Sequence, residues 1–356
     1  MNYRIEKLQE MLCKENLDAV LVFSPSNRRY LTGFAGSTGY AIVTKENIDF
    51  LVDFRYQEQA KEQCPGWNLV SIRGEADVFQ YLQEKNVKNL GLEKDFVTLR
   101  FAETLKNCVD IGGTKDVSAL FTELRMQKDE QELEAIKRAC EITDMAFAHV
   151  LTQIKEGMTE AEIDCILQGY MRNFPEVDRM ADRFIVASGE HGALPHGIAG
   201  ERKVQNGDMI TMDFGCNCHG YWSDVTRTVC LGKGNDKQKE IYRITLEAQE
   251  AAIAAVKPGK TGREIDKVAR DVIAKAGYGE YFGHGLGHSF GLDIHESPRC
   301  AQNAMGDIVL QPGMIMTIEP GIYIPGFGGV RIEDDIMVTE DGCINLTKAP
   351  KHFIEL

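Results

Sequence analysis

The segment "KEGMTEAEID" at residues 155–164 decides how the C-terminal part of this chain folds, because it recurs 102 residues later as "KPGKTGREID" at residues 257–266. Six of the ten positions are identical. Both copies contain the pattern T-x-x-E, at Thr159 and Glu162 and again at Thr261 and Glu264. This pattern is typical of a capping box, in which the two residues satisfy free backbone N–H groups at a helix start. We therefore predict that a helix begins in each copy.

The sequence around each copy extends this pattern to two related halves. A long helical segment precedes each copy, a shorter helix follows it, and strands come next. The first long segment, residues 128–154, has apolar residues at helical spacing and acidic residues at its start, which suit the positive end of a helix dipole. The C-terminal part is therefore predicted to be a duplicated helix–helix–strands α+β domain. Two unrelated helices that share capping chemistry are the alternative.

The first ~120 residues alternate helical and strand patterns, which is typical of an α/β domain. The predicted buried strands are "DAVLVFSP" (residues 18–25), "YAIVT" (40–44) and "IDFLVD" (48–53). The segment "ADVFQYLQEKN" (76–86) predicts a helix. The pattern breaks near residues 114–128. A length of 356 residues suits two domains, and we place them at residues 1–121 and 122–356.

Composition and charge exclude several classes of protein. A formal net charge of −14 argues against general nucleic-acid binding, which needs a basic surface. The N-terminus is a polar amphipathic helix without the pattern of a signal peptide, and no segment approaches 18 continuous apolar residues, so no membrane span is expected. The ten cysteines include no C-x-x-C pair and are interpreted as reduced thiols. These features favour a cytoplasmic protein.

A second group of residues indicates chemistry. The segment "GHGLGHSFGLDIHE" (residues 283–296) contains His284, His288 and His295 among glycines. The first two histidines are four apart, as in the helical zinc motif, but the residue after the first is Gly285 and not a glutamate. Glycines cost a helix about 1 kcal/mol each against alanine, so a turn leading into an extended stretch is predicted instead. Any metal held here needs ligands from elsewhere in the chain.

Two aspartates lie in a predicted β-hairpin at residues 208–231, "DMITMDFGCNCHGYWSDVTRTVCL". If the turn centres on Cys218 and His219, then Asp213 and Asp224 lie opposite each other in the sheet. Two facing carboxylates repel each other unless a positive charge lies between them. A bulge in either strand would change this register.

Two glutamates lie at comparable strand ends in the second half. Glu319 closes the apolar strand in "GMIMTIEPGIY" (residues 313–323), and Glu333 lies with Arg331 in "GVRIEDDIMVTEDG" (329–342). Burial of such a glutamate alone costs several kcal/mol, which a metal or the arginine would offset. Each residue alone is typical of a solvent-exposed loop or strand face. The whole set, rich in oxygen with one or two imidazoles, indicates a two-metal site for Mn²⁺, Co²⁺, Fe²⁺ or Zn²⁺.

These residues carry a resemblance to a known family. The order Asp213, Asp224, His288, Glu319, Glu333 resembles the metal ligands of the pita-bread metallopeptidases, a family that includes methionine aminopeptidase, aminopeptidase P, prolidase and the non-metal enzyme creatinase. The strings "MDFGCNCHGYWSDVTRT", "GHGLGHSFGLDIHE", "TIEPGIY" and "GVRIEDD" support it. The resemblance covers residues 122–356 and implies the pita-bread fold, whose pseudo-twofold symmetry suits the repeat.

The N-terminal part narrows the resemblance to one branch. "NRRYLTGFAGSTG" (residues 27–39) is similar to the N-terminal domain of creatinase and of the proline-specific enzymes. "ALPHG" (193–197) places His196 at the position of a catalytic histidine in that branch. His295 and Arg331 also match positions typical of the branch. The resemblance implies that His284 contacts the scissile region, that His196 and His295 stabilise the oxyanion, and that Glu319 moves the proton.

The resemblance also implies an activity. Two divalent ions, Mn²⁺ first and Co²⁺ or Zn²⁺ as alternatives, are expected on the five ligands, with a bridging hydroxide that attacks the Xaa–Pro bond. Asp213 is expected on one ion, His288 and Glu319 on the other, and Asp224 and Glu333 on both. We expect aminopeptidase P activity on peptides with proline second. Prolidase is the main alternative; methionine aminopeptidase and a non-catalytic binding protein are more distant ones. A homodimer is expected.

Overall fold

The computed structural model describes residues 3–356, and the chain divides into two compact units, Met1–Arg125 and Met126–Leu356. The sequence-based boundary between residues 121 and 122 falls inside helix α6 (Ser118–Met126), four residues before this division. None of the helices in the described part of the chain is long and apolar enough to cross a membrane.

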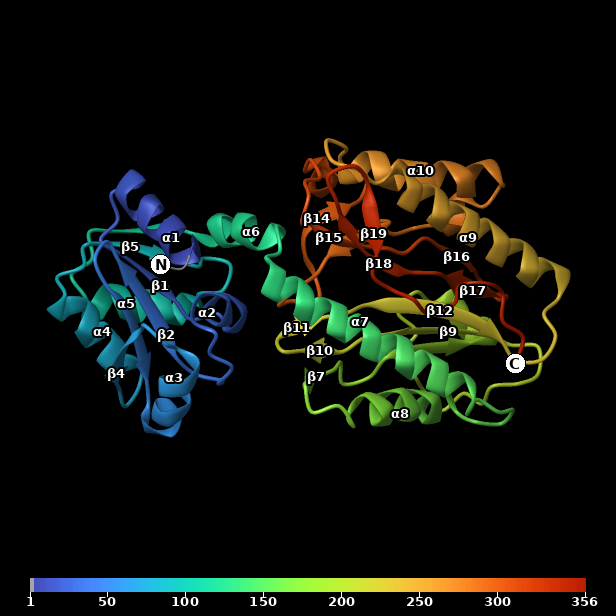
Figure 1. Ribbon diagram of the computed structural model, residues 1–356, viewed down its shortest axis with the longest axis horizontal. Coiled ribbons are helices and arrows are strands. Elements are labelled where there is room, and N and C mark those ends of the chain that lie inside the picture. The colour runs from blue at the N-terminus through green and yellow to red at the C-terminus, as the bar shows by residue number, and fades with distance from the viewer. Residues whose placement is uncertain (1–2) are drawn as a thin grey trace. The chain divides into compact units, whose positions relative to one another are not determined.

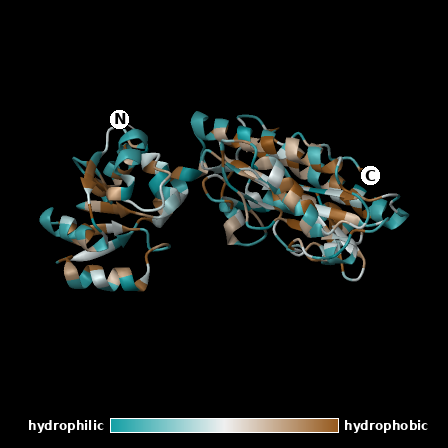
Figure 2. Ribbon diagram, turned by 90° about the horizontal axis from the view of Figure 1, so that it is seen from below, coloured by the Kyte–Doolittle hydropathy of each residue, from teal (hydrophilic) through white to brown (hydrophobic). Residues whose placement is uncertain are grey.

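The N-terminal unit is a mixed six-stranded sheet covered by helices (Figure 1). In sheet order the strands are β4 (Asn68–Ser71), β3 (Ile48–Val52), β2 (Tyr40–Thr44), β1 (Ala19–Val22), β5 (Asn89–Leu92) and β6 (Gly113–Asp116). The helices besides α6 are α1 (Tyr3–Lys14), α2 (Pro25–Thr32), α3 (Gln57–Gln63), α4 (Glu75–Glu84) and α5 (Leu99–Cys108). Figure 2 shows hydrophobic residues along the strands and a mixture of hydrophobic and hydrophilic residues on the helices. Strands β1 to β3 and helix α4 lie where the sequence predicts them.

The C-terminal unit contains the two predicted halves. In the first half, helices α7 (Glu130–Leu151) and α8 (Glu160–Met171) precede β7 (Val177–Arg179), β8 (Ile185–Ser188), β9 (Met209–Phe214), β10 (Asn217–Cys218), β11 (Tyr221–Trp222) and β12 (Val225–Cys230). In the second half, α9 (Asp236–Ala255) and α10 (Gly262–Lys275) precede β13 (Gly287–Ser289), β14 (Glu296–Cys300), β15 (Ile315–Ile318), β16 (Gly321–Ile324), β17 (Gly328–Arg331), β18 (Asp334–Val338) and β19 (Cys343–Asn345). Figure 1 shows the strands between α8 and α10.

Both predicted capping boxes are present. The Thr159 hydroxyl accepts a hydrogen bond from the Glu162 N–H at 3.1 Å, and the Glu162 carboxylate accepts one from the Thr159 N–H at 2.7 Å. Thr261 and Glu264 make the same two bonds at 3.2 Å and 2.9 Å. Each box satisfies backbone donors that a helix start leaves free, so α8 and α10 begin at equivalent positions.

Buried residues favour duplication over the alternative of two unrelated helices. The two helices bury apolar residues at the same repeat positions: Ile163, Leu167 and Met171 in α8, and Ile265, Ala269 and Ile273 in α10. The equivalent aspartates also act alike. Asp164 accepts a hydrogen bond from the Phe184 N–H at 3.2 Å, and Asp266 accepts one from the Leu286 N–H at 2.9 Å. Each bond joins a helix to the segment that leads into its own half of the site.

The hairpin register differs from the prediction. The turn is formed by His219 and Gly220, whose φ values of 50° and 93° are those of a type I′ turn, and not by Cys218 and His219. Asp213 therefore pairs with Thr226, and not with Asp224. Because Asp224 lies two residues before Thr226, both aspartates still occupy the same face of the hairpin, diagonally across the two strands.

A buried ion pair joins the two halves. Arg227 on β12 donates from Nη2 to Asp334 Oδ1 on β18 at 2.7 Å, and both side chains are almost fully buried. Arg227 also donates to the Glu333 backbone carbonyl at 2.5 Å. The strands of the two halves are thus held together directly beside the predicted metal ligands.

Candidate metal centre

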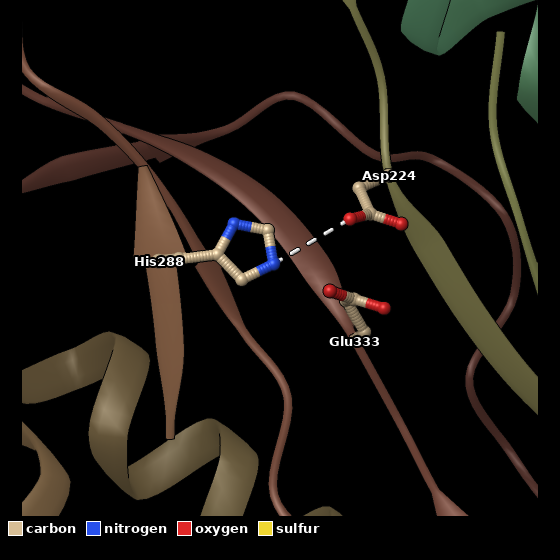
Figure 3. A group of neighbouring side chains, drawn as sticks. All are labelled: Asp224, His288 and Glu333. Atoms are coloured by element: carbon tan, nitrogen blue, oxygen red, sulfur yellow. Dashed lines mark ion pairs between the residues drawn. The ribbon is translucent and has the colours of Figure 1, made fainter. Parts of the chain in front are cut away.

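The five predicted ligands come from both halves of the C-terminal unit. Asp213 lies on β9, Asp224 directly before β12, His288 on β13, Glu319 directly after β15, and Glu333 between β17 and β18. Ligand atoms of Asp224, His288 and Glu333 all lie within 4.8 Å of one another (Figure 3). The His288 Nε2 atom lies 3.6 Å from Asp224 Oδ2 and 3.5 Å from Glu319 Oε1. Four of the five predicted ligands thus converge around one imidazole nitrogen.

The fifth ligand, the carboxylate of Asp213, is held by an arginine. Asp213 Oδ2 accepts a hydrogen bond from Arg331 Nη2 at 2.8 Å. The other donors of Arg331 are also used inside the protein: Nη1 donates to the Tyr323 hydroxyl at 2.9 Å and to the Pro195 carbonyl at 3.1 Å, and Nε donates to the Thr226 hydroxyl at 3.0 Å. The sequence predicted Arg331 as a match to the proline-specific branch and as a charge that offsets a buried glutamate; in the structure its guanidinium holds Asp213 and three neighbouring groups of the site.

Neighbouring groups orient the ligands. His288 Nδ1 lies 3.1 Å from the Ser289 carbonyl, which accepts its proton and leaves Nε2 free for a cation. The Thr226 hydroxyl donates to Glu333 Oε2 at 2.6 Å, and the Asp224 backbone N–H donates to Asp335 Oδ2 at 2.9 Å. These bonds orient the ligand atoms.

Steric contact explains why one position of the histidine-rich segment, residue 287, is a glycine. A Cβ atom on Gly287 would lie 2.1 Å from the Thr317 carbonyl oxygen, so β13 lies against β15 closely enough to exclude any side chain. The next residue is His288, whose backbone N–H donates to the Thr317 hydroxyl at 3.1 Å. The close approach therefore brings the imidazole to the carboxylates. As predicted, no helix forms between residues 283 and 296.

The carboxylates repel one another in a buried place. Burial, and then the charges of neighbouring carboxylates, raise the pKa of Asp224 and of Glu319 well above their ordinary values. The same causes raise the pKa of Glu333 to about 8. Burial lowers the pKa of His288 to about 3, so its imidazole is neutral and able to bind a cation. Within the described residues, Arg331 forms an ion pair with the fourth carboxylate, that of Asp213, at 2.8 Å.

The donor set fits divalent cations. Carboxylate oxygens with one imidazole nitrogen suit the divalent metals from Mn²⁺ to Zn²⁺. The single positive charge of Arg331 does not balance four carboxylates, and divalent cations would offset the repulsion that remains among them. A cavity of about 1060 Å³ opens beside these groups, large enough for a small peptide. A duplicated domain with a buried ligand set of this kind beside an open cavity defines a metal-dependent enzyme.

The remaining predicted residues line this cavity. His196, His284 and His295 all face it. The His295 ring packs edge-to-face on the His288 ring with centroids 4.4 Å apart. His284 Nε2 lies 2.9 Å from the Tyr323 hydroxyl, and burial lowers the pKa of His284 to about 4. The structure thus brings all the predicted site residues to one place.

Sequence reasoning missed three residues of the site. Tyr323 links His284 to Arg331, and Thr226 links Arg331 to Glu333. Arg299, on β14 opposite His288, lines the cavity, and we find no hydrogen-bond or ion-pair partner for its guanidinium within residues 3–356. Arg299 could have been predicted as a site residue from its position, because it lies four residues after His295 on a strand that starts in the histidine-rich segment.

Comparisons with known proteins identify the family. The pattern of metallopeptidase family M24 matches residues 134–340, and that of the creatinase/prolidase N-terminal domain matches residues 4–127. The chain therefore belongs to metallopeptidase family M24, in the pita-bread fold with a creatinase-like N-terminal domain, and it is a hydrolase.

Three relatives illustrate the similarity. The chain is 40% identical over 356 residues to a Xaa-Pro dipeptidase of Pyrococcus horikoshii, covering 99% of both chains. It is 42% identical to the solved Xaa-Pro dipeptidase from Bacillus anthracis, with a TM-score of 0.95 and 99% of both chains covered. It is 35% identical to the solved X-Pro aminopeptidase from Thermotoga maritima, with a TM-score of 0.92, covering 99% of this chain and 100% of that one.

The carboxylate cluster makes the stability of chelator-treated protein depend on pH. The folded-state pKa of Glu333, about 8, lies above its ordinary value of 4.5. The stability that the protonated group retains at acidic pH is therefore lost as pH rises through about 8. We expect the Tm of chelated protein to fall by at least about 3 °C between pH 5 and pH 8, the interval between the two pKa values, measured by thermal unfolding. Protein saturated with Mn²⁺ is the control and should change less. An equal fall in both samples would contradict the prediction.

Proposed function

We propose that this protein is a Xaa-Pro dipeptidase, or prolidase, which hydrolyses the bond before proline in dipeptides. The single observation that carries the choice is Arg299, whose guanidinium lines the cavity beside the metal-ligand cluster and has no hydrogen-bond or ion-pair partner among residues 3–356. A dipeptidase must bind the free carboxylate directly after the scissile bond, and a planar guanidinium suits a carboxylate. Both Xaa-Pro dipeptidase relatives described above support this proposal. It replaces aminopeptidase P, the first choice from sequence, by its alternative.

Asp213, Asp224, His288, Glu319 and Glu333 are proposed to hold two divalent cations, Mn²⁺ first. Bound divalent cations supply an activated water near neutral pH and polarise the scissile carbonyl. Glu319 takes the proton of the attacking water and delivers it to the proline nitrogen; a raised pKa suits this exchange. His196 and His295 donate hydrogen bonds to the carbonyl oxygen as it gains charge. The burial of His295, which lowers its pKa, keeps it a neutral donor.

Substrate length tests the proposal. The purified protein is stripped with a chelator, reloaded with Mn²⁺, and offered a Xaa-Pro dipeptide, a Xaa-Pro-Yaa tripeptide and a Xaa-Ala dipeptide. We expect cleavage of the first with little cleavage of the other two. Preferred cleavage of the tripeptide would instead support an X-Pro aminopeptidase, the activity in the printed name of the Thermotoga maritima relative. The homodimer and the cytoplasmic location stay predictions.

The replacement Arg299→Ala tests the role of the free guanidinium. We expect KM for the Xaa-Pro dipeptide to rise about 10- to 100-fold, because a charged hydrogen bond contributes about 1.5–3 kcal/mol. Arg299→Lys should recover part of the loss. The control Arg172→Ala removes an exposed arginine after α8 and should leave KM unchanged. Steady-state kinetics check all three variants. An unchanged KM in Arg299→Ala would remove Arg299 from substrate binding.

A further inference from the structure

A buried carboxylate outside the cavity holds the loop that carries His196. Glu160 is the first residue of α8 and its side chain is fully buried. It accepts hydrogen bonds from the Ser188 N–H at 2.7 Å, from the Ser188 hydroxyl at 2.8 Å and from the Gly200 N–H at 3.3 Å. Ser188 and Gly200 stand at the two ends of the loop of residues 189–199. One side chain therefore ties both ends of this loop to one helix.

The same carboxylate also contacts the inside of the loop. His191 Nδ1 lies 2.9 Å from Glu160 Oε2. Arg202 donates to the Ser188 hydroxyl at 2.5 Å and pairs with Asp208 at 2.6 Å, so a positive charge lies one hydrogen bond away from Glu160. A buried carboxylate is stable only when its oxygens are satisfied in this way. Glu160 is therefore the centre of the network that orders the loop.

The opposite side of the loop is held by strand β17, which carries Gly329 and Arg331. The Pro195 carbonyl, next to His196, accepts a hydrogen bond from Arg331. A Cβ atom on Gly329 of β17 would lie 2.2 Å from the Gly192 carbonyl oxygen, so the two backbones are in close contact. His196 thus lies in a loop that is fixed by Glu160 on one side and by β17 on the other.

The repeat supplies an independent comparison, because Gly262 occupies the position of Glu160 in the second half. A Cβ atom on Gly262 would lie 2.0 Å from the Arg299 carbonyl oxygen. At this position the second half places β14, with its cavity-lining Arg299, directly against the start of α10. Equivalent positions on the two helices therefore seat the two segments that carry His196 and Arg299.

We propose that Glu160 is a positioning residue for His196, acting through the loop of residues 189–199. The proposal rests on the proposed function, in which His196 donates a hydrogen bond to the reacting carbonyl oxygen. Replacement of Glu160 by alanine leaves the N–H groups of Ser188 and Gly200 without their acceptor and frees both ends of the loop, whereas glutamine keeps one acceptor oxygen and frees one end. The His196 imidazole is then no longer held at the reacting carbonyl oxygen, and a displacement of about 1 Å can lower the rate about 10²-fold.

Kinetics of four variants test this proposal: Glu160→Gln, Glu160→Ala, His196→Ala and the double variant Glu160→Ala/His196→Ala. We expect each single change at Glu160 to lower kcat about 10- to 100-fold, with KM within about threefold. Where His196 is already absent, the loss of Glu160 should lower kcat less than about twofold, because residues that act through one another are not additive. The control Glu134→Gln alters an exposed glutamate of α7 and should keep kcat within about twofold.

Backbone hydrogen exchange separates this inference from the proposed function. In Glu160→Gln we expect faster exchange in residues 189–200 and unchanged exchange in α10, whatever substrate the protein cleaves. If Glu160→Ala does not fold, His191→Ala supplies the second variant and should lower kcat about 3- to 10-fold. Multiplicative effects of Glu160 and His196, or unchanged exchange in the loop, would overturn the proposal. A wild-type rate in His196→Ala would instead remove His196 from the proposed function. The exchange result would still show whether Glu160 orders the loop of residues 189–199.

Discussion

Replacement of Glu333 by glutamine is expected to lower kcat on a Xaa-Pro dipeptide about 10³-fold. Glu333 is buried, its Oε2 atom accepts the Thr226 hydroxyl hydrogen bond, and its ligand atoms meet those of Asp224 and His288. Glutamine keeps the shape but removes the negative charge that a shared divalent cation needs. A metal ion contributes several kcal/mol to the stabilisation of transition-state charge, and about 4 kcal/mol corresponds to 10³ in rate.

Metal content and kinetics together check this expectation. Glu333→Gln should retain fewer divalent ions per chain than the wild type after dialysis against buffer without metal. The matched control is Glu340→Gln, which changes an exposed glutamate two residues after the end of β18 and should keep both metal content and kcat. Two ions per chain in Glu333→Gln with an intact rate would show that the ligand assignment is wrong.

Replacement of His196 by alanine is expected to lower kcat/KM about 10²- to 10³-fold, which is the usual effect of losing one donor to a developing oxyanion. His196 lines the cavity, and its neighbour Pro195 is tied to Arg331, which also binds Asp213. The imidazole is therefore held in register with the carboxylate cluster. The metal content should stay unchanged, because His196 is not among the proposed ligands.

The exposed His352 supplies the matched control for this variant. His352→Ala removes a histidine near the C-terminus and should keep kcat/KM within about twofold. Rates for the dipeptide, together with metal analysis of both proteins, separate a lost hydrogen bond from a lost cation. If His196→Ala also loses metal, its low rate would no longer report on the carbonyl oxygen.

Local and repeated patterns of the sequence predicted much of the fold. The capping boxes could be read from T-x-x-E alone, because their two bonds join residues three apart. Strands β1 to β3 were predicted from their apolar runs, whereas the short strands β4 and β6, which carry few apolar residues, were not. The predicted hairpin register was wrong by two residues. The turn needs a positive φ at His219, and a histidine does not by itself indicate a positive φ.

The candidate site was predictable as a set of residue types, but its internal contacts were not. The order of aspartates, histidine and glutamates, supported by the family resemblance, singled out the residues that the fold brings together. Which arginine is free depends on long-range contacts: Arg331 meets Tyr323 and Asp213, while Arg299 meets neither. Such bonds join residues far apart in the chain, and no spacing rule encodes them.

The division of the ligands between the two halves has a consequence for the history of the fold. Asp213 and Asp224 belong to the first half, while His288, Glu319 and Glu333 belong to the second. An ancestor with a single half could have gathered a comparable cluster only by pairing with a second copy of itself. Within one chain the two halves can differ at equivalent positions, as position 160 has a glutamate where position 262 has a glycine.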